Sequence, residues 1–367
     1  MAIEHDTLTM GVEEEFLLVD DEGGLGAEGP AVSEETEDDR AGQVEHELRR
    51  CQVESATEVS TGIDELTDHL RTLRTRLAAE ATDRRLRLLP SGCAPLAEDT
   101  GPRFTPDERY QGMAREFGSL AKQSLTCACH VHIGIPDRAT GLVISNGLRP
   151  WLPVLLAVTA NSPFHDGVDT GYASWRYLMW KRWPSAGPPA HVSSVDEYES
   201  GVDGLLRAGA ILDRGMIYWD VRLSEHEPTV EIRISDVAVD VPDAALLAAF
   251  VRALAGRALD VSDNRLSAAL SQEVLRARLW RSARDGLAGQ CVDPVSGDLL
   301  PTWQVVDELV EWVGSQLRHT GDADFVAETL ARLRTGGGGA ARQRDAFARR
   351  ERLTDVVDDL ALAGANR

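Results

Sequence analysis

Polar and apolar residues alternate from Thr229 to Asp236, and this period of two predicts a β-strand with one apolar and one polar face. On the polar face, Glu231 and Arg233 project side by side, as a site needs to hold a metal ion next to an anionic oxygen. The alternative is an ordinary half-exposed strand that carries a salt pair. The predicted apolar face comprises Val230, Ile232 and Ile234, and the predicted polar face comprises Thr229, Glu231, Arg233 and Ser235.

The stretch from Leu8 to Asp20 is also predicted to be a strand, and it contains three consecutive glutamates. The period of two places Glu13 and Glu15 on one face and Glu14 on the other. A buried carboxylate must be paired or bound to a metal ion, so this pattern favours a site unless the strand is an exposed edge with solvated charge.

A third strand is predicted from Cys51 to Val59, with Gln52 and Glu54 on the same face. The segment before it, Val44 to Arg50, has a short helical pattern. Glu47 in that segment could join the polar face from the preceding turn, although a residue in such a place more often lies at the surface.

The strand predicted from Thr126 to Pro136 carries two cysteines and two histidines within six residues. Alternation places Cys127 and Cys129 on one face and His130 and His132 on the other, so the four cannot converge on one tetrahedral zinc ion. We interpret the cysteines as core residues and the histidines as site candidates, with a purely structural histidine pair as the alternative.

Two shorter strands are predicted, Leu86 to Pro90 and Met216 to Ser224, and the second would form an antiparallel hairpin that places Arg222 beside Glu231. Helices are predicted from a cap at Thr61, from Thr105 to Ser124, on both sides of Arg149-Pro150, from a cap at Ser194, and over nearly all of the chain after Asp240. We therefore expect an α+β protein with one catalytic domain over residues 1–367, in which 8–240 form the sheet part and 241–363 a helical part.

The composition narrows the possible partners. The 60 acidic residues exceed the 38 basic ones and give a net charge of -22, which argues against nucleic acid and anionic membranes as partners. Five cysteines, an odd number in a long chain with no signal peptide, indicate a reduced cytoplasmic protein. The most apolar run, Trp151 to Ala160, is too short to span a bilayer.

The segment from Asn161 to Pro189 is long for a loop but too rich in tryptophan to be disordered. Arg176 and Arg182 form the only dense basic feature near the proposed site in sequence, and they could bind a carboxylate or phosphate. Gly336 to Gly339 is interpreted as a helix break, with a phosphate cradle as a weaker alternative.

The predicted polar faces together indicate which metal ions and which substrate the site would bind. Several carboxylates inside a sheet are tolerable only if divalent cations neutralise them, and carboxylates with one or two imidazoles favour Mg²⁺ or Mn²⁺ over zinc. Such ions beside arginines suit a nucleoside triphosphate, with catalysis by charge neutralisation and positioning. The contributing residues are Glu13, Glu15, Glu54, His130, His132, Arg222, Glu231 and Arg233, with Arg176 as a further candidate.

Five motifs, in this order, resemble the type 2 glutamate–cysteine ligases, most closely the bacterial carboxylate–amine ligases. They are Gly11-Val-Glu-Glu-Glu-Phe-Leu-Leu-Val-Asp, Gln52-Val-Glu-Ser-Ala-Thr, Cys129-His-Val-His-Ile-Gly, Asn161-Ser-Pro with the later Asp-Thr-Gly and Ser-Trp-Arg, and Thr229-Val-Glu-Ile-Arg-Ile-Ser-Asp. The resemblance implies a six-stranded antiparallel sheet curled into a half-barrel, as in glutamine synthetase and the guanidino kinases, with Mg²⁺ and ATP on its concave face.

The resemblance also implies roles for individual residues. The catalytic arginines would be Arg233, near the transferred phosphate, and Arg222. The remaining roles are metal binding by Glu13, Glu15, Glu54, His130 and Glu231, and substrate binding by Arg176, Asn161 and His132.

The implied reaction converts a carboxylate, typically the γ-carboxyl of L-glutamate, into an acyl phosphate, which an amine, typically that of L-cysteine, converts into an amide. Two alternatives stay open: a ligase of the same fold that joins another acid and amine in a biosynthetic pathway, and a metal-dependent amidohydrolase, suggested by His130-x-His132. The sequence leaves the oligomeric state open, with a homodimer as one option.

Overall fold

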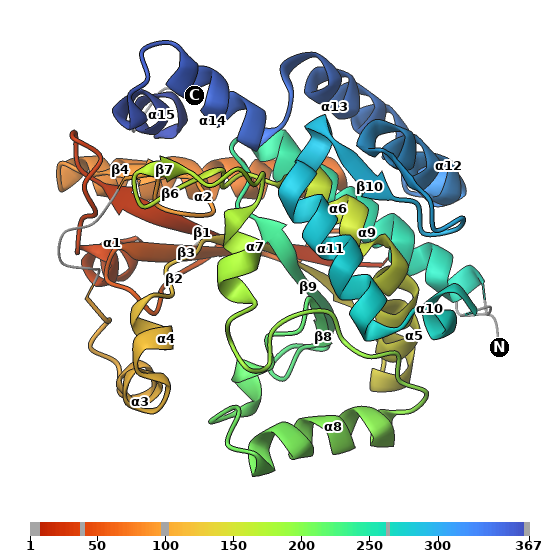
Figure 1. Cartoon of the computed structure of the whole chain (residues 1–367). Coiled ribbons are helices and arrows are strands. Elements are labelled where there is room, and N and C mark those ends of the chain that lie inside the picture. Colours follow the sequence, from red (N-terminus) through yellow and green to blue (C-terminus); the bar gives the residue numbers. More distant parts are fainter. Residues whose placement is uncertain (1–7, 37–40, 97–102, 262–264, 363–367) are drawn as a thin grey trace.

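The computed structural model describes residues 8–36, 41–96, 103–261 and 265–362 of the chain. A mixed arrangement of helices and one large sheet is visible in Figure 1, where α2 (Ile63–Asp83) lies above β1 (Met10–Val19) and β3 (Gln52–Thr57). The short helices α3 (Glu108–Phe117) and α4 (Ser119–Lys122) lie on the opposite side.

The large sheet is antiparallel throughout and has the strand order β2-β3-β1-β5-β9-β8, with β4 paired to the end of β1. The antiparallel sheet expected from the sequence is confirmed. It has seven strands rather than six, because residues 42–46, predicted to lie partly in a short helical segment, pair with β3 as an edge strand. The remaining strands of this sheet are β2 (Gly42–His46), β4 (Arg87–Leu89), β5 (Ala128–Gly134), β8 (Val221–Leu223) and β9 (Thr229–Asp236).

The apolar face of the sheet packs against α2 and α9 (Val241–Asp260). The leucines of α2 recur on one side of the helix and are buried, which is the pattern that predicted this helix. Gly62, not Thr61, caps its first turn. The cysteines expected in the core, Cys127 and Cys129, are fully buried as free thiols.

Glu14 points to this apolar face, as the alternation predicted. Its carboxylate receives two hydrogen bonds from Arg74 of α2, at 2.8 and 2.6 Å, and both side chains are buried. Arg74 also donates to the carbonyls of Ala238 and Val239. The exposed-edge interpretation of β1 is therefore wrong, because this bidentate pair lies inside the protein.

The pairing of β5 with β9 contains an irregularity that the sequence did not reveal. Cys129 lies opposite Ser235 and Val131 opposite Ile232, so two residues of β9 face the single residue His130. Such a bulge reverses the alternation beyond it. Ser235 consequently lies on the apolar face rather than beside Glu231, and Asp236, opposite Ala128, lies on the polar face.

The start of α3 is shifted from its predicted signal, as is that of α2. Asp107, rather than Thr105, caps α3 and accepts from the backbone N–H groups of Arg109 and Tyr110. Gly118, with φ of 52°, separates α3 from α4. The cap at Ser194 is confirmed, since its side chain accepts from the Glu197 N–H at the start of α8 (Val195–Arg207).

The part after residue 240 is mostly helical, as predicted, but includes the hairpin β10 (Gln290–Val292) and β11 (Leu299–Pro301). The other elements are α1 (Gly29–Glu35), α5 (Arg138–Leu148), η1 (Arg149–Trp151), α6 (Leu152–Thr159), β6 (Phe164–His165), β7 (Val168–Asp169), α7 (Trp175–Trp180), η2 (Arg214–Met216), α10 (Arg265–Ala269), α11 (Gln272–Asp285), η3 (Gly286–Ala288), α12 (Thr302–Thr320), α13 (Ala323–Gly336), α14 (Gly339–Ala348) and α15 (Leu353–Leu360).

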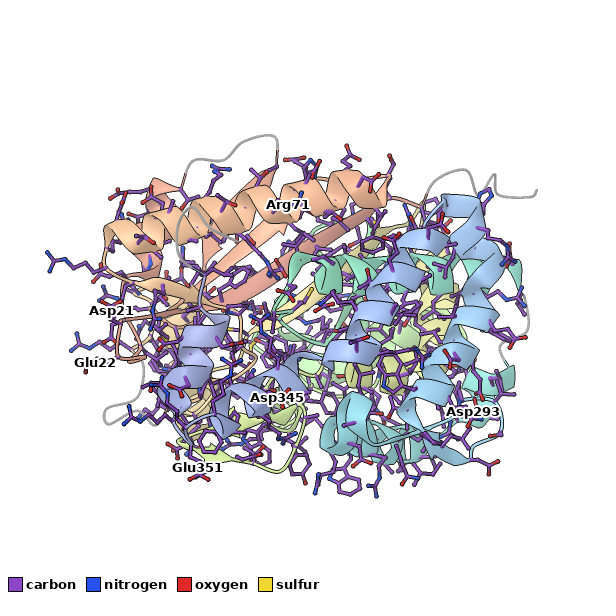
Figure 2. All side chains as sticks on the ribbon, turned by 90° about the horizontal axis from the view of Figure 1, so that it is seen from above. Asp21, Glu22, Arg71, Asp293, Asp345 and Glu351 are labelled. Atoms are coloured by element: carbon purple, nitrogen blue, oxygen red, sulfur yellow. The ribbon has the colours of Figure 1, made fainter. Side chains whose placement is uncertain are left out.

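The surface carries much of the acidic excess, as the exposed Asp21, Glu22, Asp345 and Glu351 in Figure 2 illustrate. One segment, Arg138–Thr159, is long and apolar enough to cross a membrane. However, 89% of that segment's most apolar window is buried inside the protein, which is typical of a core helix.

Candidate active site

The polar face of the sheet collects acidic and basic side chains from four neighbouring strands. Across β1 and β5, Glu13 lies opposite His130, and across β1 and β3, Glu15 lies opposite Glu54. Residues directly opposite each other in a sheet share a face, so these four side chains must meet. Glu231 of β9 extends the cluster, with His132 and Arg222 opposite it on its two neighbouring strands.

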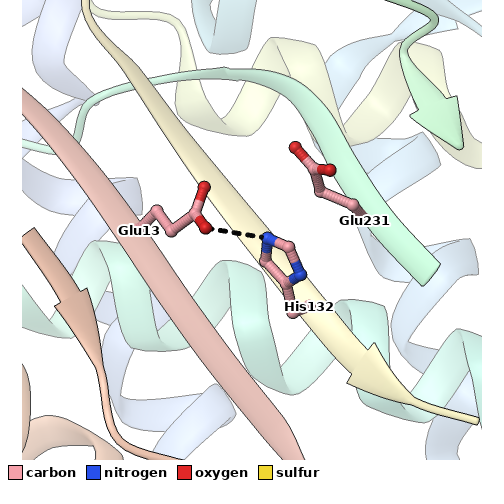
Figure 3. A group of neighbouring side chains, drawn as sticks. All are labelled: Glu13, His132 and Glu231. Atoms are coloured by element: carbon pink, nitrogen blue, oxygen red, sulfur yellow. Dashed lines mark ion pairs between the residues drawn. The ribbon is translucent and has the colours of Figure 1, made fainter. Parts of the chain in front are cut away.

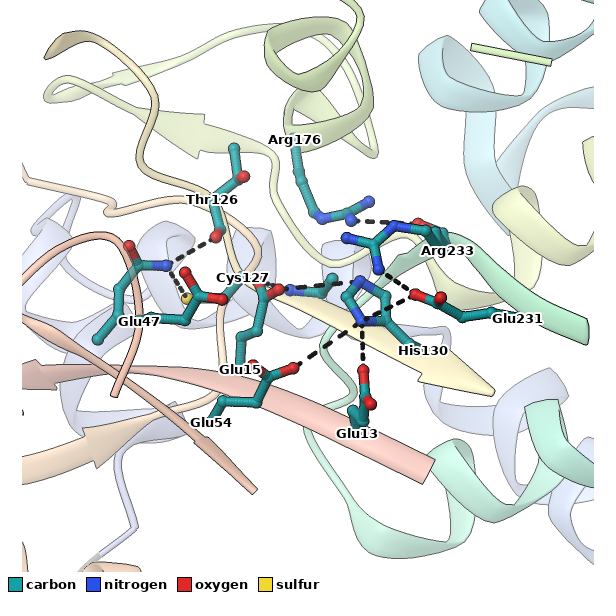
Figure 4. Close-up of polar contacts among 12 residues, drawn as sticks. Glu13, Glu15, Glu47, Glu54, Thr126, Cys127, His130, Arg176, Glu231 and Arg233 are labelled. Carbon is teal, nitrogen blue, oxygen red and sulfur yellow. Dashed lines mark hydrogen bonds and ion pairs between the residues drawn. The ribbon is translucent and has the colours of Figure 1, made fainter. Parts of the chain in front are cut away.

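His130 lies at the centre of this cluster (Figure 4). Its Nδ1 is 3.0 Å from a Glu13 oxygen, and 4.0 Å from oxygens of both Glu54 and Glu231. Its Nε2 is 3.8 Å from a Glu15 oxygen and has no hydrogen-bond partner among the described residues. A buried imidazole nitrogen without a partner, surrounded by carboxylates, is a suitable metal ligand.

His132 approaches the other side of Glu13 (Figure 3). Its Nε2 is 3.2 Å from a Glu13 oxygen, and its Nδ1 is 2.8 Å from the Thr229 hydroxyl. Together with Glu231, these residues form a group whose ligand atoms all lie within 4.8 Å of one another. The structure thus moves His132 from the predicted substrate-binding residues to the candidate metal ligands.

Two further groups satisfy the same criterion: Glu13, Glu54 and His130 form one, and Glu15, Glu47 and Glu54 form the other. Glu13 and Glu54 each belong to two groups, so the candidate cation positions share ligands. The sequence left Glu47 open between the polar face and the surface. It follows the last residue of β2, so no strand alternation places its side chain.

The pKa values of the acidic group Glu15, Glu47 and Glu54 are all raised. Burial, and after it the charge of Glu47, raise the pKa of Glu15 from its usual 4.5 to about 8. Burial also raises the pKa of Glu54 well above its usual value, with Glu13 and Glu47 adding to the shift. Burial raises the pKa of Glu47 as well. Carboxylates in this environment fit divalent cations, which would favour their ionised forms.

The other acids of the cluster are held ionised by their neighbours. Burial acts to raise the pKa of Glu13, but hydrogen bonds to His130 and His132 outweigh it and hold that pKa well below its usual value. For Glu231, the charges of Arg233 and Arg222 overcome burial in the same way and lower the pKa.

The two predicted catalytic arginines both bind Glu231. Arg222 donates to it at 2.6 Å and also to the carbonyls of Gly215 and Ile217, while Arg233 pairs with its other oxygen. Burial lowers the pKa of His130 to about 4, and the charge of Arg233 contributes to this shift. His130 is therefore neutral at neutral pH and can act as a ligand.

Two of the predicted substrate-binding residues lie elsewhere. Asn161 is buried, and its amide nitrogen donates to the carbonyls of Pro90 and Val237, so it fixes loops at the end of the sheet. Arg176 is also buried and lies next to Arg233, where it donates to the carbonyls of Arg233 and Ile234 (Figure 4). Neither is among the residues that line the pocket beside the cluster.

A pocket of about 210 Å³ opens beside the cluster. Glu13, Glu15, Glu54 and His130 line one part of it, and an aromatic wall with nearby arginines lines the rest. Sequence reasoning noted the tryptophans between 161 and 189 without assigning them a position. Glu47, whose place the sequence left open, lines the pocket, and the lining residues that it did not assign include Arg109, Tyr110, Trp180, Trp183 and Tyr218.

Residues 9–359 match a family model described as glutamate–cysteine ligase family 2. The chain belongs to this family. A relative from Rhodococcus jostii (strain RHA1), named "Putative glutamate--cysteine ligase 2-1", is 50% identical over 352 residues, which cover 96% of this chain and 95% of the relative. A relative of the same name from Saccharopolyspora erythraea is 46% identical over 351 residues, which cover 96% of this chain and 93% of the relative. The resemblance inferred from the five motifs is confirmed.

Solved structures of other ligases share the fold of this member of glutamate–cysteine ligase family 2. A glutamate–cysteine ligase from Francisella tularensis, solved in complex with AMP, has a TM-score of 0.69 at 14% identity and covers 98% of this chain and 88% of its own. A bifunctional glutathione synthetase from Pasteurella multocida has a TM-score of 0.69 at 15% identity, covering 97% of this chain and 52% of its own. At such low identity these likenesses show the fold alone. Because the sheet is antiparallel and the family is that of a ligase, the amidohydrolase hypothesis is dropped.

Metal-free protein is expected to lose thermal stability as the pH rises from about 6.5 to about 8. Burial raises the pKa of Glu15 from 4.5 to about 8, so the folded state retains a proton that the unfolded state releases. The resulting stabilisation is complete below pH 4.5 and is lost as the pH rises through 8. Burial lowers the pKa of His130 from 6.5 to about 4, and this shift makes stability rise with pH, but only below pH 6.5. Thermal unfolding followed by circular dichroism measures this slope.

The matched control for this experiment is the same titration with saturating Mg²⁺. Cation binding should displace the protons of the acidic group, so the midpoint with Mg²⁺ should fall less, or not at all, over the same pH interval. A metal-free midpoint that stays constant or rises over this interval would contradict the assignment of protonated, buried carboxylates.

Proposed function

We propose that this protein is an ATP-dependent carboxylate–amine ligase whose active site is the polar face of β1, β3, β5 and β9. Membership of the glutamate–cysteine ligase family supports the class of reaction. We propose further that the sheet curves as a half-barrel around this site, that the whole chain acts as one catalytic domain, and that two copies can associate as a homodimer.

One observation carries the proposal. Glu15, Glu47 and Glu54 converge in a pocket, and none of them forms an ion pair with an arginine or lysine in the described part of the chain. Leaving such a group without a counter-charge is costly, and Mg²⁺ with the phosphate oxygens of ATP would supply both charge and ligands. The proposed metal ligands are therefore Glu13, Glu15, Glu54, His130 and Glu231, joined by Glu47 and His132.

When bound, Mg²⁺ or Mn²⁺ would neutralise the phosphate charge and hold the triphosphate in line with the acid. We assign the fixed positive charge of the site to Arg233. Its pairing with Glu231 and its contact with Arg176 hold it at the pocket wall, so the guanidinium needs no reorganisation to receive a phosphoryl oxygen. Arg222 orients Glu231 from the other side.

In the proposed reaction, a carboxylate oxygen of the acid attacks the γ-phosphorus of ATP, and ADP leaves with the electrons of the broken phosphorus–oxygen bond. The amine nitrogen then attacks the acyl carbon. The bond between the acyl carbon and the phosphate oxygen breaks, phosphate leaves with its electrons as the amide forms, and the amine transfers a proton to water. The site contributes positioning and charge stabilisation, and no covalent bond to the protein is required.

The proposed substrates are L-glutamate and L-cysteine. A second candidate is a ligase of the same fold that uses another amine, and the aromatic wall of the pocket favours it. Trp180, Trp183 and Tyr218 line the pocket, and an apolar amine would contact these aromatic rings more extensively than cysteine does.

Trapping with hydroxylamine tests the reaction class. We expect the protein, given ATP, Mg²⁺, L-glutamate and hydroxylamine, to form a hydroxamate in amounts equal to the ADP released, because hydroxylamine intercepts the acyl phosphate. The reaction without ATP is the control. Hydroxamate formed without ATP, or ADP released in equal amount when no acid is present, would contradict the proposal.

A further inference from the structure

The pocket has a wall of aromatic rings that packs against Arg233. The ring centroids of Trp180 and Tyr218 are 4.6 Å apart, and those of Trp183 and Tyr218 are 5.5 Å apart. The Arg233 guanidinium carbon lies 5.8 Å from the Trp180 centroid and 5.9 Å from that of Tyr218. These rings therefore contact the guanidinium of Arg233 while its partner Glu231 binds it, and both contacts restrict its position.

Two N–H donors at this wall lack an acceptor. Trp180 Nε1 and Arg233 Nε are both shielded from solvent, and neither has a hydrogen-bond partner in the portion of the protein that the structure describes. By contrast, Trp183 Nε1 donates to the Ser124 hydroxyl at 3.0 Å. A buried donor without an acceptor costs free energy, and both of these belong to residues that line the pocket.

An indole N–H and a guanidinium N–H can only donate, so the missing partner must be an acceptor. An anionic oxygen suits both, since it carries several lone pairs and is attracted by the arginine. We infer that Trp180 is a substrate-binding residue whose indole N–H, together with Arg233, binds an anionic oxygen of the substrates. This inference rests on the proposed function, under which the oxygen belongs to the acid's carboxylate or to the transferred phosphoryl group.

Helix α7 supplies a matched control. Trp175 is its first residue and Trp180 its last, and Trp175 Nε1 is also buried without an acceptor among the described residues. Trp175 packs against His165 and Tyr172 and does not line the pocket. If the indole of Trp180 is unpaired only because of imperfect packing, the two residues should respond to ligands in the same way.

The first test is the ¹⁵N–¹H spectrum of the tryptophan indoles in the whole protein, which has eight tryptophans. The variants Trp180→Phe and Trp175→Phe assign the two signals and keep an aromatic ring at each position. L-glutamate, inorganic phosphate and a non-hydrolysable ATP analogue with Mg²⁺ are added separately and together. We expect the Trp180 indole proton to shift downfield and the Trp175 signal to stay in place, and the ligand that causes the shift identifies the oxygen.

The second test is the rate of ADP release at varied glutamate and ATP concentrations. Trp180→Phe should raise the KM of the substrate that supplies the oxygen roughly tenfold or more, the effect of losing one hydrogen bond to a charged group. Trp175→Phe should keep both KM values within about twofold of wild type.

The outcomes separate this inference from the proposed function. A wild-type protein that releases no ADP with any acid would contradict the proposed function, while the spectra would still test binding of phosphate and the nucleotide. An active wild type whose KM values are unaffected by Trp180→Phe, or a Trp180 signal that no bound ligand moves, would overturn the assignment of Trp180. Equal responses of Trp180→Phe and Trp175→Phe would overturn it as well.

Discussion

Replacing Glu54 with Gln is expected to lower the rate of ADP release by roughly 10²-fold or more while leaving the metal-free protein as stable as wild type or more stable. Glu54 belongs to two of the three candidate metal groups. Burial raises its pKa, and the neighbouring acids Glu13, Glu47 and Glu15 raise it further, so the folded metal-free protein must keep this carboxyl protonated at a free-energy cost that the neutral amide avoids. The substitution should therefore lower the Mg²⁺-dependent rate of ADP release and not the stability of the metal-free protein.

Thermal unfolding without metal, Mg²⁺ titration and ADP release measure the three effects of Glu54→Gln. Glu58→Gln, an exposed change just after the same strand, is the control and should alter none of them. A Glu54→Gln protein with unchanged Mg²⁺ dependence and rate would contradict the metal assignment. A large loss of metal-free stability would contradict the raised pKa of Glu54 in the acidic group.

Replacing Glu231 with Gln should instead reduce both activity and stability. Glu231 is fully buried between Arg222 and Arg233, and both arginines bind its carboxylate. A neutral amide leaves these two cations without an ionised partner, and breaking a buried pair from one side typically costs about 3 kcal/mol or more. The rate should fall by roughly 10²-fold or more, because a metal ligand and the anchor of Arg233 are lost together.

Urea unfolding and ADP release measure these two losses. The exposed Glu227 lies in the turn that leads into β9, so Glu227→Gln is a control for the charge change alone. If Glu231→Gln unfolds at the wild-type urea concentration, the two buried ion pairs of Glu231 do not stabilise the protein as predicted. If it retains the wild-type rate, Glu231 does not act in the site.

The sequence allowed the centre of the site to be predicted because strand alternation depends only on residue order. Glu13 and Glu15 share a face wherever β1 lies, and the same holds for Gln52 and Glu54 on β3. The pairing that brings these faces together follows from the antiparallel order of the strands. The hairpin that places Arg222 opposite Glu231 was predictable for the same reason.

The end of β9 could not be predicted in this way. The bulge opposite His130 depends on how two strands remote in sequence fit together, and nothing in the order Arg233-Ile234-Ser235-Asp236 reveals it. The bulge moves Ser235 off the polar face and brings Asp236 onto it. There Asp236 accepts hydrogen bonds from the Asn161 backbone and the Ser162 and Ser174 hydroxyls.

Residues outside regular strands were the least predictable. Arg176 is polar and close to the site in sequence, which suggested substrate binding, but it is buried and serves to hold β9. Glu47 and Trp180 line the pocket although no period places them there, because the tertiary packing of the segments after β2 and after α6 decides their positions. Their roles were accessible only from the three-dimensional arrangement.

We propose that the polar face of the sheet activates a carboxylate with ATP for attack by an amine. The most direct measurement is ADP release across a matrix of acids and amines, with and without Mg²⁺. We predict that ADP release requires Mg²⁺ and an acid, with L-glutamate among the acids that support it, and that an amide forms in equal amount when the amine is present. ADP release that is indifferent to the acid and the amine, or amide formation that proceeds without ATP, would contradict the account.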